Sequence, residues 1–102
     1  MKKEEILTYL SNVKKKYEQE GFIIKGLFGS YSRGEETPQS DIDILIEATP
    51  TFANKYGFQS ISRMKEIQNE LSLHFGTPVD FADITGLGKT GREFIIKRTI
   101  YV

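Results

Sequence analysis

The 102-residue chain contains no cysteine, and this absence removes several kinds of chemistry at once. Disulfides, zinc–thiolate sites and thiol catalysis all require a cysteine sulfur. No apolar run approaches the ~20 residues of a membrane-spanning helix. The first twenty residues, MKKEEILTYLSNVKKKYEQE, are interrupted by charge and contain no apolar core of a signal peptide. We therefore expect a soluble, cytoplasmic protein.

The chain also lacks an excess of charge of either sign, because 14 Lys and Arg balance 14 Asp and Glu. Nucleic acid and anionic membranes are usually bound by a basic surface, so we expect neither as a partner. The length predicts a single domain, residues 1–102, with a limited core. We expect such a domain to bury some surface against a partner or a second copy of itself.

Helical and extended segments alternate along the chain. Apolar residues at three- and four-residue steps predict helices over 3–20 and 58–75, the second with its apolar stripe running from Ile61 to Phe75. Strands are predicted over 22–28, 41–47, 78–84 and 99–102, with a helical turn at 30–34, a short helix at 90–97 and an irregular surface loop at 48–56 that could lie over a site. Helices alternating with strands indicate an α/β fold, and the short link between the first two strands favours a mixed sheet.

The stretch from Gly29 to Asp43, GSYSRGEETPQSDID, contains the chemistry. Asp41 and Asp43 are two residues apart at the start of a strand, so their carboxylates share one face. Two carboxylates this close repel each other unless a cation lies between them, and their oxygens suit Mg²⁺. The small Gly29-Ser30 turn after the preceding strand offers backbone contacts for phosphates.

A third carboxylate comes from Asp80 or Asp83 in the segment PVDFADI. Three residues apart in a strand, the two side chains face opposite ways, so one of them can join the site. Asp80 faces the site if its neighbours Val79 and Phe81 face the core. Asp83 lies at the strand end, where an aspartate is common in turns.

Together these motifs resemble the signature of the nucleotidyltransferase superfamily related to DNA polymerase β. The resemblance lies in Gly29-Ser30, a ten-residue gap and then Asp41-x-Asp43. The short length, the sequence Ser32-Arg33-Gly34 and the late PVDF strand resemble its minimal nucleotidyltransferases, the MNT group. Ser32 stands where many relatives have Ala. The resemblance implies the polymerase β-like fold, with a mixed sheet of about four strands and helices mainly on one side.

The same resemblance implies transfer of AMP from ATP to a hydroxyl, with release of pyrophosphate. Asp41, Asp43 and Asp80 would be the catalytic acids that ligate two Mg²⁺ ions, which stabilise the attacking and leaving oxygens. Asp80 would also help to take the proton of the acceptor. Ser30 would bind a terminal phosphate oxygen, while Gly29 would let the backbone approach it. Arg33 would add charge near the pyrophosphate, or is a surface arginine at the end of a helical turn.

The chain lacks the second, acceptor-binding domain of larger relatives, which suggests that the acceptor is another protein. The resemblance implies the antitoxin of a toxin–antitoxin pair, which transfers AMP to a tyrosine of a HEPN-type toxin. One alternative is a nucleotide-binding antitoxin that neutralises its partner by occlusion without catalysis. A third is a nucleotidyltransferase that modifies a small molecule.

Overall fold

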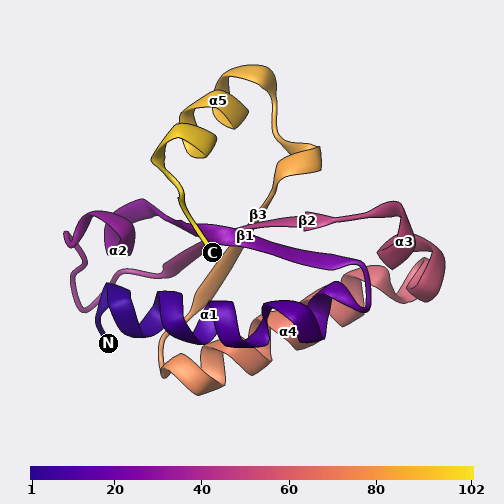
Figure 1. Ribbon diagram of the computed structural model, residues 1–102, viewed down its shortest axis with the longest axis horizontal. Coiled ribbons are helices and arrows are strands. Elements are labelled where there is room, and N and C mark those ends of the chain that lie inside the picture. Colours follow the sequence, from indigo (N-terminus) through magenta and orange to yellow (C-terminus); the bar gives the residue numbers. More distant parts are fainter.

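The structure, a computed structural model, describes all residues, 1–102, and has helices on both sides of one sheet (Figure 1). In chain order the elements are α1 (Lys3–Glu18), β1 (Phe22–Phe28), α2 (Gly29–Arg33), β2 (Ile42–Ala48), α3 (Pro50–Tyr56), the 3₁₀ turn η1 (Gly57–Gln59), α4 (Ser60–Phe75), β3 (Val79–Asp83), the 3₁₀ turn η2 (Ile84–Gly86), α5 (Lys89–Arg98) and β4 (Ile100–Tyr101). Helices α1 and α4 run along one face, whereas α5 stands on the opposite side. None of the helices is both long and apolar enough to traverse a bilayer.

The four strands form one mixed sheet in the order β3-β2-β1-β4. Strand β1 pairs antiparallel with β2 and β4, while β2 and β3 are parallel. Gly26 in the middle of β1 permits the pairing with β4, because a Cβ at this position would overlap the carbonyl oxygen of Ile100. The register between β1 and β2 also shifts between Ile24 and Gly26. The predicted mixed sheet is confirmed.

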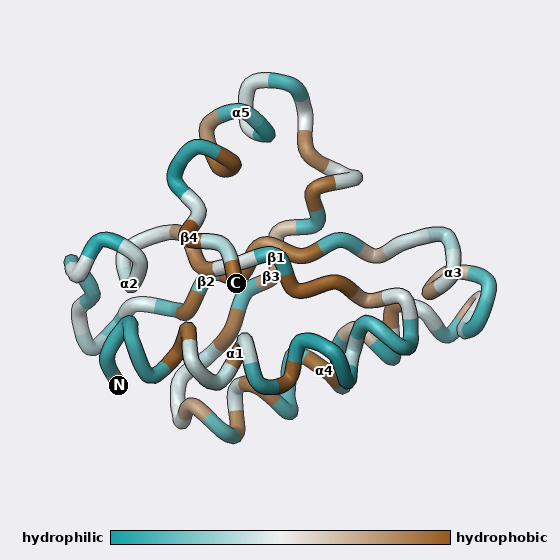
Figure 2. The backbone as a smooth tube through the Cα atoms, viewed as in Figure 1, coloured by the Kyte–Doolittle hydropathy of each residue, from teal (hydrophilic) through white to brown (hydrophobic).

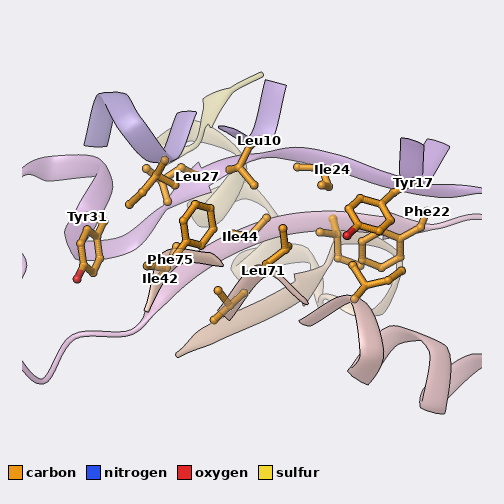
Figure 3. Packing of buried hydrophobic residues seen from close by; sticks show 14 of the residues in the cluster. Leu10, Tyr17, Phe22, Ile24, Leu27, Tyr31, Ile42, Ile44, Leu71 and Phe75 are labelled. Carbon is orange, nitrogen blue, oxygen red and sulfur yellow. The ribbon is translucent and has the colours of Figure 1, made fainter. Parts of the chain in front are cut away.

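The hydrophobic core lies between the sheet and the helix pair α1 and α4 (Figure 3). Its fully buried aliphatic members include Ile6, Leu10, Ile24, Leu27, Ile42, Ile44, Ile46, Ile67 and Leu71. Each such side chain stabilises the fold by roughly 1.5–3 kcal/mol on burial. Figure 2 shows hydrophobic residues along the strands and many hydrophilic residues along α1 and α4. Since Ile42, Ile44 and Ile46 face the core, the residues between them face the side on which α5 stands.

The segment 48–56, predicted as an irregular loop that could lie over a site, instead contains the end of β2 at Ala48 and the helix α3. Thr49 precedes it in an extended conformation, and Pro50 takes the first helical turn, where its missing N–H is not needed. Phe52 is buried and its ring lies 5.1 Å from that of Tyr56, one turn later. The helix follows Ala48, which is five residues, or about 16 Å, along β2 from Asp43. The expected position over the site is therefore wrong.

The stripe predicted along α4 is confirmed except at its first member. Ile67, Leu71 and Phe75 are buried and Met64 packs against the core, but Ile61 is 70% exposed. A helix turns about 100° per residue, which puts Ile61 roughly 120° around the axis from Ile67. It therefore lies at the edge of the stripe. The polar member Gln68 donates a hydrogen bond to the carbonyl of Val79, 2.5 Å away, which ties α4 to β3.

Candidate active site

The Gly-Ser turn lies where β1 ends and the single helical turn α2 begins. Phe28 is extended, and Gly29 then adopts a φ of 76°, which favours glycine over any residue with a side chain. Glycine is needed for a second reason, because a Cβ here would overlap Oδ2 of Asp43 on the neighbouring strand. The turn and one predicted acid are thus in direct contact across the β1–β2 pair.

Two buried side chains, Tyr31 and Ser32, anchor helix α2. Tyr31 is buried against the core, and Ser32 is also buried although it is polar. The Ser32 hydroxyl donates a hydrogen bond to the carbonyl of Gly29, 2.6 Å away. Gly34 ends the helix in the left-handed conformation. These contacts hold the Gly29-Ser30 turn in place and leave Ser30 half-buried at the helix start.

Three of the predicted acids lie near each other at one end of the sheet. The parallel register of β2 and β3 pairs Asp43 with Asp80, so the two side chains are neighbours on the same face. Asp41 immediately precedes β2 and is two residues from Asp43. Val79 is almost fully buried and Phe81 packs against the core, which leaves Asp80 on the opposite face, as expected.

Asp83 takes no part in this group. Its Oδ1 accepts hydrogen bonds from the backbone N–H of Thr85 at 3.0 Å and from the Thr85 hydroxyl at 2.7 Å. Its partner across the parallel pair is Ile46, three positions along from the Asp43–Asp80 pair. Asp83 thus caps the 3₁₀ turn η2.

Burial and the negative charges of the neighbouring aspartates raise the pKa values of Asp43 and Asp80. Burial raises the pKa of Asp43, and the charges of Asp80 and Asp41 raise it further, while Arg33 opposes the shift. Burial also raises the pKa of Asp80, together with a hydrogen bond to Asp41 and the charge of that residue. Both groups therefore hold a proton more readily than an isolated aspartate. A divalent cation would offset this repulsion, and carboxylate oxygens are the ligands that Mg²⁺ takes.

The three aspartates suit a metal ion by the chemistry of their oxygens and by their position at one end of the sheet. No three His, Cys, Asp or Glu side chains converge as ready-made ligands around one point. The donor set and the mutual repulsion nevertheless suit a hard cation, because Asp43 and Asp80 are neighbours across the parallel strand pair and Asp41 lies close enough to raise the pKa of Asp80. The arrangement places neighbouring carboxylates beside a Gly-Ser turn, which suits a cation and a phosphate that bind next to each other.

Sequence comparison identifies the group to which this arrangement belongs. Residues 8–102 match the model of the nucleotidyltransferase domain family. The chain belongs to this family. The protein adenylyltransferase MntA of Thermococcus cleftensis is 30% identical over 101 residues, which cover 97% of this chain and 94% of that protein. A candidate protein adenylyltransferase of Methanocaldococcus jannaschii, MJ1379, is 41% identical over 54 residues, which cover 53% of this chain and 49% of that relative.

Solved structures give the same result for the fold of this nucleotidyltransferase. It superposes on a candidate minimal nucleotidyltransferase with a TM-score of 0.76 and 24% identity, covering 100% of this chain and 97% of that one. A toxin–antitoxin structure with AMP-PNP superposes with a TM-score of 0.64 and 25% identity, covering 89% of this chain and 69% of the other. The expected minimal nucleotidyltransferase fold is confirmed.

Arg33 of the nucleotidyltransferase lies at the surface beside the group of acids. Its Nε donates to Oε1 of Glu35 at 2.6 Å, and both side chains are more than half exposed. Such a surface pair contributes little to stability. The guanidinium is also close enough to Asp43 to lower the pKa of that carboxyl. Arg33 is thus a surface arginine whose positive charge reaches the group of acids.

The sequence reading missed one wall of the site region. Arg33 and Gly29 line a cavity of about 410 Å³ whose other side is α5. Three of the α5 residues in this wall, Thr90, Phe94 and Arg98, are spaced four residues apart and so share one helix face. The sequence alone therefore shows that these three residues would share a face of a helix. This shared face gained meaning only when the fold placed α5 opposite α2.

Proposed function

We propose that residues 1–102 act as a single nucleotidyltransferase domain that transfers AMP from ATP to a hydroxyl of a partner protein in the cytoplasm. One observation carries the proposal: Asp43 lies against Gly29 on one side and beside Asp80 on the other. A phosphate on the Gly-Ser turn would therefore lie next to the clustered carboxylates. The names of the MntA relative and of the toxin–antitoxin neighbour with AMP-PNP support this reaction.

The chain's own residues then have separate roles. Ser30 would donate a hydrogen bond to a terminal phosphate oxygen, and the backbone at Gly29 would approach the same phosphate. Arg33 would balance charge on the leaving pyrophosphate, exchanging its exposed contact with Glu35. Asp41, Asp43 and Asp80 would hold two Mg²⁺ ions. Bound there, Mg²⁺ supplies positive charge for the attacking and leaving oxygens of an in-line displacement.

Asp80 is the carboxylate nearest the acceptor in this scheme. In the transfer the acceptor oxygen bonds to the α-phosphorus, the bond from that phosphorus to the pyrophosphate oxygen breaks, and the hydroxyl proton leaves. Asp80 accepts this proton if the hydroxyl comes within hydrogen-bond reach. It lies on β3, an edge strand, and a pocket of about 370 Å³ beside it is lined by Lys65, Gln68 and Asn69 of α4. The acceptor would approach from this edge.

We propose a HEPN-type toxin as the partner, with this chain as its antitoxin and a tyrosine as the acceptor. The toxin–antitoxin neighbour supports the class of partner, and the protein adenylyltransferases support the class of acceptor.

The test incubates the chain and its partner with ATP labelled in the α-phosphate, with and without Mg²⁺. The wild-type pair should label the partner only with Mg²⁺, and a chelator should stop the reaction. The double variant Asp41→Asn, Asp43→Asn should transfer no label while its circular dichroism spectrum stays unchanged. The matched control is Asp83→Asn, because that aspartate caps a turn outside the group of acids. It should transfer label normally.

Two outcomes would contradict catalysis by these acids. An unlabelled partner with the wild-type chain would reject transfer to that protein, and full labelling by the double variant would reject the assigned acids. A double variant that transfers no label but still neutralises the toxin would instead establish the occlusion mechanism.

A further inference from the structure

The cavity between α2 and α5 has the size and lining of a small-molecule site. Its volume of about 410 Å³ falls within the roughly 300–1,000 Å³ typical of ligand pockets. Apolar side chains, Phe28, Phe94 and Ile95, form much of its wall. Two arginines, Arg33 and Arg98, are also among the residues that line it. An apolar wall with a few polar groups suits a flat ligand that carries a negative charge at one end.

The cavity borders the proposed phosphate site, because Gly29 and Arg33 belong to its wall. Gly29 lines the cavity and also lies against Asp43, while Arg33 lines the cavity and acts electrostatically on the same carboxyl. A nucleotide whose phosphates rest on the Gly29-Ser30 turn therefore has this cavity directly beside it. We propose that the base and ribose of the donor nucleotide bind here, with the base stacked on Phe94. This inference rests on the proposed function.

Phe94 is available for stacking. The residue is 59% exposed, although it belongs to the cavity wall. The guanidinium of Arg98 lies over one face of the ring, 4.2 Å from its centroid. The other face of the ring is free of such a cation. A nucleobase on that face would bury aromatic surface that is otherwise in water, and stacking of this kind works for any base.

The last turn of α5 is hydrogen-bonded to the residues that lead into β4. The Thr99 hydroxyl donates to the carbonyl of Ile95 at 2.7 Å, and the Tyr101 hydroxyl donates to that of Ile96 at 3.2 Å. None of the α5 residues is fully buried. The helix therefore keeps apolar surface that the sheet does not cover, and Thr90 and Arg98 offer hydrogen-bond donors beside it.

The proposal is tested by calorimetric titration of the full chain with two probes in the presence of Mg²⁺. ATP carries the base and ribose, whereas inorganic tripolyphosphate carries only the phosphates. Phe94→Ala should weaken ATP binding about 5- to 150-fold, which is the range for loss of one aromatic stacking partner, and leave tripolyphosphate binding unchanged. Phe94→Tyr keeps the ring and should bind ATP like the wild type.

Phe58→Ala is the matched control, because this exposed phenylalanine of η1 lies outside the cavity. It should leave both affinities unchanged. Equal ATP affinity in Phe94→Ala and the wild type would overturn the proposal. The same holds if Phe94→Ala weakens binding of the partner protein but not of ATP. Equal weakening of both probes would also overturn it, since a distorted site rather than lost stacking would then be the cause. Wild-type protein that binds tripolyphosphate as tightly as ATP would refute the base pocket and leave the phosphate site standing, whereas binding of neither probe would reject the proposed function itself.

Discussion

Replacing Gly29 by alanine separates the backbone requirement of the Gly-Ser turn from its contact with the acids. Gly29 and Gly34 lie at the two ends of α2, with φ values of 76° and 69°. An alanine at either position pays the left-handed strain of roughly 1–2 kcal/mol. Only at Gly29 would the new Cβ also overlap a carboxylate oxygen, that of Asp43, because no atom lies within 4 Å of a Cβ at Gly34. Gly34→Ala is therefore the matched control.

Both variants should unfold more easily, and one should also lose activity. The loss of about 1–2 kcal/mol should lower the melting temperature, because each kcal/mol corresponds to about 4–8 °C in a domain of this size. In Gly29→Ala the Asp43 carboxylate must also move, and a displacement near 1 Å can cost about 100-fold in rate. We expect about that loss in label transfer for Gly29→Ala and a rate within a few-fold of the wild type for Gly34→Ala.

The measurements are thermal unfolding by circular dichroism and transfer of labelled AMP at a temperature where every variant is folded. Similar transfer rates for the two variants would refute the claim that contact between Gly29 and Asp43 positions the acid. An undiminished melting temperature in Gly34→Ala would refute the strain that the comparison assumes.

Two further substitutions test the fold away from the site. Gly26→Ala should destabilise the protein by about 1–3 kcal/mol in urea unfolding, because its Cβ would push the carbonyl of Ile100 out of the β1–β4 pair; an unchanged midpoint would contradict this close approach. Glu20 accepts hydrogen bonds from Arg63 at 2.7 and 2.8 Å, and chiefly these lower its pKa from 4.5 to about 2. The stability that it contributes is present above about pH 4.5 and is lost as the pH falls toward 2. Glu20→Gln should therefore lower the melting temperature at pH 7 and flatten its decline between pH 4.5 and 2. The control Glu66→Gln, at a 65% exposed partner of the same arginine, should have little effect. If the melting temperatures of the wild type and Glu20→Gln decline in parallel with pH, Glu20 is not the source of this acid sensitivity.

The local periodicity of the sequence was sufficient for most elements of the fold. Helices α1 and α4 follow from the spacing of their apolar residues, which depends only on helical geometry, and strand β1 follows from its short apolar run. The helix α3 was missed because its apolar members, Phe52 and Tyr56, are too few to establish a period. A Pro at the first turn of a helix also resembles a Pro in a loop until the following residues are seen to pack.

The sequence by itself determined which groups the site would contain: a Gly-Ser turn, and acids two residues apart at the start of a strand. It also separated Asp80 from Asp83, since alternation along a strand is a local property. Only the tertiary structure decided that Asp43 would touch Gly29 and pair with Asp80, because strand order and register join residues that are 14 and 37 positions apart in the chain. The position of α5 across the cavity from α2 was likewise decided there, since no local pattern specifies which face of a sheet a helix will cover.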